Sequence, residues 1–177
     1  ASRLAQNADT GFIGVSMHGP FDVCESEALK LLRSVGNPKA RCNSDVVRPI
    51  LNAQEITRRA EQRWVVAFPP AMELEDAALY EAPFELVRRV VKPVRDENRR
   101  KAYRDRWWIH GEARPAMQAA LLGIDRCVAT PRVSKHRVFV WIPVCNLPSD
   151  ATVAFAFCGD LPFGVMHSRV HEVWTRA

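Results

Sequence analysis

The chain has 177 residues, of which 47% are hydrophobic and 25% are charged, a composition that is typical of a folded globular domain and excludes a disordered or fibrous protein. Its 25 basic and 20 acidic residues give a formal net charge of +5, which permits nucleic acid as a partner without requiring it. Five widely spaced cysteines without a Cys-x-x-Cys pair argue against a disulfide framework or a zinc site, and they predict reduced thiols in a cytoplasmic protein.

The first 70 residues predict short strands and one helix. A strand is expected within residues 11–21, because apolar side chains there lie between glycines, and another over 63–68, which ends at Pro69. Residues 25–38 predict a helix with Ala28 and Leu31 on its apolar face and its end at Gly36. Residues 44–56 predict an extended connection with a strand piece, interrupted by Pro49.

The remaining chain alternates helical and extended patterns. Residues 72–108 predict a helical region in which Pro83 starts a second helix. Strands are expected over 127–131, 138–143 and 152–158, followed by a closing helix over 162–177 with Val165, Met166, Val170 and Trp174 inward. These patterns predict a single α/β domain of the α+β kind, with a mixed, largely antiparallel sheet and packed helices. No apolar run approaches the roughly 20 residues of a membrane helix, so we expect no membrane partner.

Two patterns bear on catalysis. His167 and His171 lie four residues apart on a predicted helix, a spacing that can bind zinc, but residue 168 is Ser where a zinc protease has its Glu. Glu27 and Lys30 resemble the acidic-x-Lys pair of nuclease cores, although a surface charge pair on a helix explains them as well. We expect neither a metal site nor a catalytic residue in this chain.

The positive charge is concentrated in one stretch. Between Arg88 and Arg106 there are nine basic and three acidic residues, a local excess of +6 that exceeds the net charge of the whole chain. Such a stretch can bind the phosphates of nucleic acid, and the candidates are Arg95, Arg99, Arg100, Lys101 and Arg104. A solvated helix is the alternative, and Trp107 and Trp108, which follow the stretch, are expected in the core.

A second basic group precedes a hydrophobic run in "PRVSKHRVFVWIP", residues 131–143. The strands on either side predict a hairpin with a polar tip. Cationic side chains on such a rigid support can read base edges in the major groove, and a plain solvated loop is the alternative. The candidates for base reading are Arg132, Ser134, Lys135, His136 and Arg137.

Six motifs in a fixed order connect the chain to a known family. They are "NSDVVRPILNAQEI", "RWVVAF", "ALYEAPFELVRRVVKPVR", "RWWIHGEARPAM", "ATPRVSKHRVFVWIP" and "FGVMHSRVHEVW". This series resembles the target recognition domain of MmeI-like (type IIG and IIL) restriction–modification enzymes and related adenine-specific DNA methyltransferases, and the resemblance extends from about Gly11 to Trp174.

The resemblance implies a function in DNA recognition. In this family the domain recognises a short duplex sequence, while a methyltransferase module of the same chain methylates the target adenine. The parent enzyme would use S-adenosylmethionine, with magnesium as a further candidate cofactor. The S-adenosylmethionine loop and the Asn/Asp-Pro-Pro-aromatic motif are absent from these 177 residues, so we expect a recognition domain over 1–177, a fragment of a longer protein, with no cofactor and no enzymatic activity of its own. The family's base-reading region maps onto residues 132–137.

Two other classes of function stay open on the residues alone. One is a stand-alone metal-dependent nuclease or hydrolase that uses His167, His171 and Glu172. The other is a protein-docking module that binds a methyltransferase through its apolar helix faces and does not contact DNA.

Overall fold

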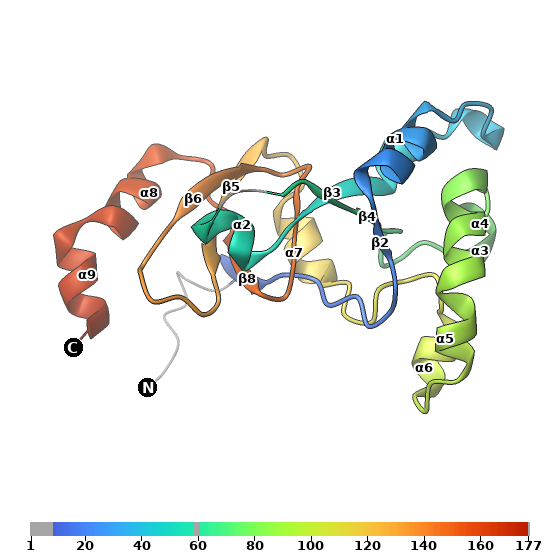
Figure 1. Cartoon of the computed structure of the whole chain (residues 1–177). Coiled ribbons are helices and arrows are strands. Elements are labelled where there is room, and N and C mark those ends of the chain that lie inside the picture. Colours follow the sequence, from blue (N-terminus) through green and yellow to red (C-terminus); the bar gives the residue numbers. More distant parts are fainter. Residues whose placement is uncertain (1–8, 59–60, 177) are drawn as a thin grey trace. The chain divides into compact units, whose positions relative to one another are not determined.

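The computed structural model describes residues 9–58 and 61–176 (Figure 1). By their internal contacts the residues divide into two compact units. Unit 1 consists of Ala1–Gly14, Leu51–Ala60 and Ala116–Ala177, and unit 2 of Val15–Ile50 and Glu61–Pro115. Each unit is therefore assembled from separate stretches of the sequence.

Unit 1 is built on an antiparallel sheet. Its strands are β1 (Gly11–Ile13), β8 (Thr152–Phe155), β5 (Arg126–Pro131) and β6 (Val140–Pro143), hydrogen-bonded in that order. Ala154 pairs with Phe12 on one side and with Ala129 on the other, and Ala129 also pairs with Val140, so these side chains share one face of the sheet. Ala129 and Ala154 are fully buried, which identifies this face as a core layer.

The opposite face of this sheet carries aromatic side chains that contact the C-terminal helices α8 (Asp160–His167) and α9 (Arg169–Arg176). The Trp141 ring stacks on Phe163 of α8 with a centroid distance of 4.8 Å. Phe139 makes edge contacts with His167 and His171 at 5.6 and 6.2 Å. These ring contacts attach both helices to the sheet.

The predicted closing helix is wrong in two respects. The helix is interrupted at Ser168, whose backbone is extended (φ −65°, ψ 150°), so α8 and α9 run in different directions (Figure 1). Of the four side chains expected to point inward, only Met166 is buried, whereas Val170 and Trp174 are 80% and 73% exposed. The interruption rotates α9, so the residues after Ser168 no longer continue the apolar face of α8.

Unit 1 also contains α2 (Ala53–Thr57), α7 (Pro115–Ala120) and the short strand β7 (Leu147–Pro148). The sequence Asn52-x-x-Glu55 starts α2 as a capping box, in which the Asn52 N–H donates to Glu55 Oε2 at 2.5 Å. The Gly14 backbone lies so close to Pro148 and Ser149 that an added Cβ would stand 2.2 Å from the Ser149 carbonyl oxygen. A side chain at this position would therefore displace the chain beside β7.

Unit 2 combines short antiparallel strands with several helices. Strand β4 (Arg63–Val66) pairs with β2 (Asp22–Val23) and with β3 (Val47–Leu51). Helix α1 (Glu25–Arg33) lies between β2 and β3 in the sequence. Four helices follow β4: α3 (Leu74–Ala77), α4 (Glu81–Val90), α5 (Lys92–Asp96) and α6 (Lys101–Asp105). The core of the unit includes Phe21, Val65, Phe68, Tyr80 and Val87, all at most 2% exposed.

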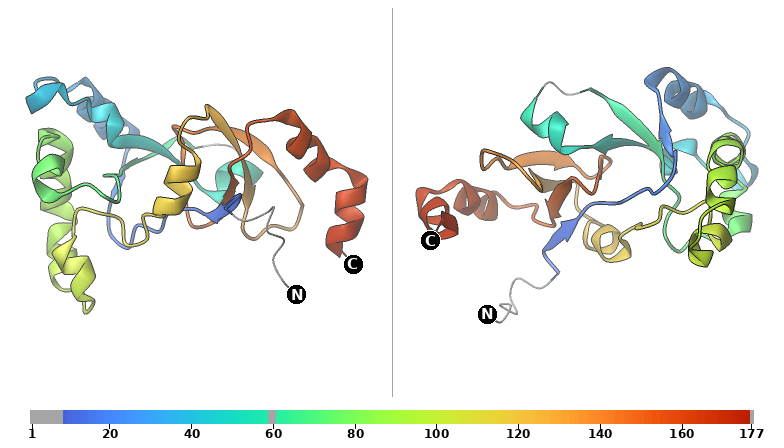
Figure 2. Two further views of the ribbon diagram at one scale, coloured as in Figure 1. Left: turned by 180° about the vertical axis from the view of Figure 1, so that it is seen from behind. Right: turned by 60° about the horizontal axis from the view of Figure 1, so that its bottom comes forward.

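The helical region over 72–108 is broken into four short helices, which Figure 2 shows grouped together in green and yellow within unit 2. Pro83 lies in the first turn of α4, as predicted, where its missing N–H is tolerated. Pro93 cannot donate to the carbonyl of Arg89, and the chain leaves α4 at Val90 and starts α5 at Lys92. Trp107 and Trp108 are 7% and 5% exposed, which confirms them as core residues.

The expected α+β class, with largely antiparallel strands and packed helices, is confirmed. Helix α1 ends at Arg33, three residues before the predicted stop, and Gly36 follows with φ +102°, a conformation that favours glycine. Among the described residues, no helix is long and apolar enough to span a membrane.

Candidate nucleic-acid interface

The predicted hairpin is confirmed. Strands β5 and β6 pair antiparallel with Ala129 opposite Val140, and the Thr130 hydroxyl donates to the Val138 carbonyl at 2.7 Å. These contacts fix both ends of residues 132–137, which we call the hairpin tip. The tip is therefore a polar loop carried by the sheet of unit 1, whose strand β5 is largely buried.

All five predicted base-reading residues are exposed at this tip. Lys135 and His136 extend from its centre, and Ser134 Oγ accepts a hydrogen bond of 3.3 Å from the His136 N–H, which tightens the turn. The Arg132 backbone N–H donates to the Ala151 carbonyl at 2.8 Å and its guanidinium approaches the Asp150 carbonyl at 3.5 Å. Arg132 thus remains at the base of the tip, and Lys135 is an exposed cation nearer its centre.

Arg137 is held differently. Its Nη1 donates to the Met166 carbonyl at 2.5 Å and to Nδ1 of His171 at 2.6 Å, and its Nη2 reaches the Ser168 carbonyl at 3.4 Å. The guanidinium therefore donates hydrogen bonds to backbone carbonyls at the junction of α8 and α9. These contacts use both donors of Nη1, and they leave Nε and part of Nη2 of this exposed side chain for the expected base contact.

The tip also forms one wall of a groove of about 400 Å³, the tip groove. Its other wall is α2 with the residue that follows. The polar lining residues are Gln54, Thr57 and Arg58 on the α2 side, and Ser134, Lys135 and His136 on the tip side. The sequence prediction included the tip residues but missed the α2 side. The Asn-x-x-Glu capping box would have indicated a helix start there.

The candidate phosphate-binding residues lie in unit 2, on and around α5 and α6. Arg95 is 1% exposed, which differs from the expected surface position. Its Nη2 donates to the carbonyls of Met17 and Ile109 at 2.8 and 3.1 Å, and its guanidinium lies 4.7 Å from the centroid of the Tyr103 ring. Burial lowers the pKa of Arg95, but a guanidinium stays protonated in proteins. Arg95 therefore joins three segments of unit 2, in an interior position that a phosphate cannot reach.

Two of the remaining candidates stabilise the turn between α5 and α6. Arg104 Nη1 donates to the carbonyls of Asn98 and Arg99 at 2.6 and 3.2 Å. Arg100 Nη1 donates to the Tyr103 hydroxyl at 3.0 Å. The acceptors are neutral carbonyl and hydroxyl oxygens, so these contacts do not neutralise the positive charge of either guanidinium group. Arg99 and Lys101 are exposed beside them.

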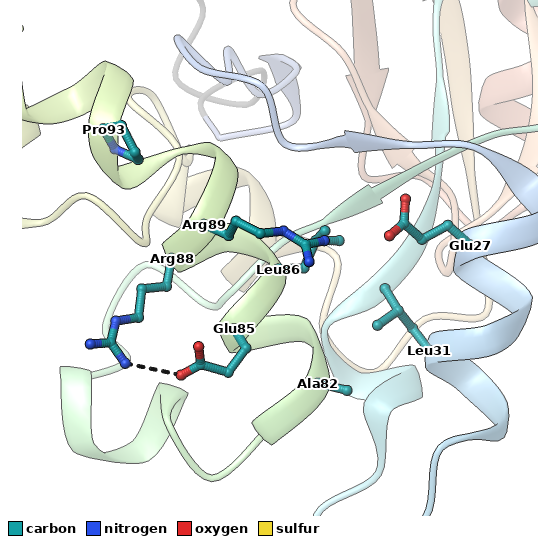
Figure 3. A pocket seen from close by; sticks show the side chains of 8 residues that line it. All are labelled: Glu27, Leu31, Ala82, Glu85, Leu86, Arg88, Arg89 and Pro93. Carbon is teal, nitrogen blue, oxygen red and sulfur yellow. Dashed lines mark hydrogen bonds and ion pairs between the residues drawn. The ribbon is translucent and has the colours of Figure 1, made fainter.

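A second groove, of about 540 Å³, lies between α1 and α4 in unit 2 (Figure 3). Its apolar part includes Leu31 and Leu86, and its rim carries both signs of charge. Arg88 is paired with Glu85 at 3.2 Å, and Figure 3 shows the Arg89 side chain extending toward Glu27 across the groove. The mixed charge makes this groove a poor site for a phosphate. Glu27 and Lys30 thus belong to an amphipathic helix that borders a groove.

The histidine pair offers little support for a metal site. His167 ends α8 and donates from Nδ1 to the Phe163 carbonyl at 3.0 Å, whereas His171 lies on α9 and accepts from Arg137. A neighbouring guanidinium opposes the binding of a cation at His171. Within residues 9–58 and 61–176, no three His, Cys, Asp or Glu side chains are grouped as metal ligands would be.

His110 is a buried titratable residue of unit 2 whose pKa is shifted far from its usual value. It is 5% exposed, its Nε2 donates to the Val66 carbonyl at 2.9 Å, and its ring contacts Phe21 edge-on at 4.6 Å. Burial lowers the pKa of His110 from 6.5 to about 4, so the ring is neutral in the folded state near pH 7. Its contacts are those of a core residue.

Comparison with known proteins gives one informative relationship. No model of a protein family matches the chain, and no curated protein matches its sequence. Among solved structures, the type IIL restriction–modification enzyme MmeI in complex with DNA has a similar fold, with a TM-score of 0.67 at 13% sequence identity. The match covers 98% of this chain and 22% of the MmeI chain. The chain therefore has the fold of a segment of MmeI, and it spans about a fifth of that protein's length.

Proposed function

We propose that this chain is a duplex-DNA recognition module of a restriction–modification DNA methyltransferase. The observation that carries the proposal is the fold shared with DNA-bound MmeI over 98% of the chain. The exposed cationic tip of a rigid hairpin supports it independently, because base reading needs polar side chains on a firm support. The methyltransferase module of the same parent chain would be the partner, in the cytoplasm, and would supply S-adenosylmethionine, with magnesium as a further candidate.

The two basic groups have separate tasks in this proposal. Contacts to phosphate position a protein on DNA, and contacts to base edges specify the sequence. Arg99, Arg100 and Lys101, with Arg104 behind them, bind phosphates. Lys135 and His136, with Ser134 and Arg132 beside them, read bases at the hairpin tip. Arg95 and Arg137 support these two surfaces from within their units.

Binding of the 177-residue chain to a labelled duplex, measured by fluorescence anisotropy over a range of salt concentrations, tests the proposal. Four to six phosphate contacts predict a slope of log K against log salt near −4 to −5, since each neutralised phosphate contributes about −0.9. Affinity that does not change with salt would contradict the proposal, and so would the absence of binding at low salt.

The chain is proposed to contain no catalytic activity of its own. Incubation with duplex DNA and radiolabelled S-adenosylmethionine checks this point directly. We expect no methyl transfer by the isolated chain, whereas a fusion that carries the methyltransferase module of its parent should methylate. Transfer by the isolated chain would show that it is an enzyme.

A further inference from the structure

The tip groove contains cations that no neighbouring acid neutralises. Arg58 and Lys135 lie on opposite walls, one after α2 and one on the hairpin tip, and both are exposed. No hydrogen bond or ion pair within the described part of the chain holds either side chain. No described residue that lines the groove is acidic. The groove between α1 and α4 differs in this respect, because Glu85 there is paired with Arg88.

The capping box of α2 explains why the groove is positive. Glu55, the acid of α2, accepts a hydrogen bond from the Asn52 N–H at the start of the helix. Its carboxylate is therefore held away from Arg58, which follows the last turn. At this end the Arg58 N–H donates to the Gln54 carbonyl at 2.8 Å, which fixes the backbone that carries Arg58. The α2 wall thus presents a cation and, one turn earlier, the exposed amide of Gln54.

We propose that the tip groove binds one nucleotide unit of the DNA. Arg58 and Lys135 hold its phosphate from opposite sides, and Gln54 contacts the edge of the adjoining base. Lys135 thus binds a phosphate in place of the base edge assigned to it above, and base reading at the tip is left to His136, Ser134 and Arg132. The chemistry fits, since cations on facing walls match the charge of a phosphodiester, and a glutamine amide can donate to and accept from adenine together. This inference rests on the proposed function, to which it adds a second sequence-reading element, α2.

A shared phosphate makes a quantitative prediction. If Arg58 and Lys135 bind two different phosphates, the double variant Arg58→Ala/Lys135→Ala should make the salt slope shallower by about 1.8, which is twice the contribution of one phosphate. If they share one phosphate, the double variant should change the slope by only about 0.9. We expect the second result, with each single variant already weakening binding.

The experiment uses the whole 177-residue chain, a labelled duplex and a salt series. Arg58→Lys should retain the wild-type slope, because it keeps the charge. Arg169→Ala is the matched control, since Arg169 is an exposed cation of unit 1 outside the groove, and it should leave the slope unchanged. Circular dichroism of each variant confirms that it is folded.

Base contact by Gln54 is tested by selecting bound duplexes from a random pool and sequencing them. Gln54→Ala should lose the preference at one base position and keep the wild-type salt slope. If the wild type bound duplex DNA and Arg58→Ala bound it with the same affinity and salt slope, the inference would be overturned and the proposed function would stand. A change of slope of about 1.8 in the double variant would overturn the shared phosphate. Absence of duplex binding by the wild-type chain would instead contradict the proposed function itself.

Discussion

Arg137 donates a hydrogen bond of 2.6 Å to Nδ1 of His171 and thereby connects the hairpin tip with α9. The same guanidinium binds the carbonyl of Met166 near the end of α8 and that of Ser168, which also accepts from the Glu172 N–H of α9 at 3.1 Å. One of the five candidate base readers is thus held by the end of one helix and the start of the next.

Arg137→Ala should therefore reduce stability more than it changes sequence preference. Loss of a charged donor to partly exposed carbonyls predicts a decrease of about 1–2 kcal/mol in the free energy of unfolding. Urea denaturation followed by circular dichroism measures it. Arg132→Ala is the control and should change stability by less than about 0.5 kcal/mol, because Arg132 makes only one long side-chain contact. A stable Arg137→Ala variant with an altered base preference would restore Arg137 to the reading surface.

Arg95 and Arg99 should respond to substitution in opposite ways. Arg95→Ala leaves a cavity and two buried carbonyls without their donor, so we expect the free energy of unfolding to fall by about 3 kcal/mol. Arg99→Ala removes an exposed side chain, and it should preserve stability but make the salt slope of DNA binding shallower by about 0.9. Urea denaturation and anisotropy of both variants check this contrast. Equal stability of the two variants would show that the buried guanidinium contributes nothing to the fold.

His110 should make the protein less stable in acid. Its folded pKa of about 4 lies below the value of 6.5 in the unfolded chain, so between these values the unfolded state binds more protons. The contribution of His110 is complete above about pH 6.5 and is lost progressively as the pH falls toward 4, by about 3 kcal/mol in total. Urea denaturation at a series of pH values should show this loss in the wild type and a smaller one in His110→Gln. Identical pH dependence in the two proteins would contradict the assignment.

Four of the five thiols should be accessible to a thiol reagent, and one should be protected. Cys127 is buried, and desolvation raises its pKa to about 11, whereas Cys24, Cys42, Cys145 and Cys158 are exposed. Because the thiolate is the reactive form, four thiols should react with Ellman's reagent in the native protein at pH 8, and the fifth only after unfolding. Cys24 should react first, since a hydrogen bond with Ser26 lowers the pKa of its thiol. Rapid reaction of all five would show that Cys127 is accessible.

The sequence predicted most strands and the class of the fold because those features depend on local patterns. The apolar runs on either side of the polar residues 132–137 were enough to predict the hairpin. Helix α2 was missed because five residues are too few to show an apolar period, although its capping box was present. The break at Ser168 was missed because no Pro or Gly marks it.

The candidate site was harder to predict than the fold. Composition singled out the basic stretch, but it could not distinguish Arg95 from Arg99, which differ in burial and not in type. Arg58 was not considered because it is distant in sequence from the hairpin tip that it faces across the groove. Arg58 and the hairpin tip become neighbours only when β5 pairs with β6 and α2 folds beside the hairpin.

The assembly of each unit from separate stretches limits how this chain can be cut or exchanged. Strand β1 pairs with β8, so Gly11 and Phe155 lie opposite each other although they are 144 positions apart in the sequence. A truncation near residue 115 would remove the partner strand of β1 and leave α2 without the hairpin that completes its groove. A transplant intended to carry the proposed DNA preference of this chain to a methyltransferase would therefore need to take the segment from β1 through α9 as one piece.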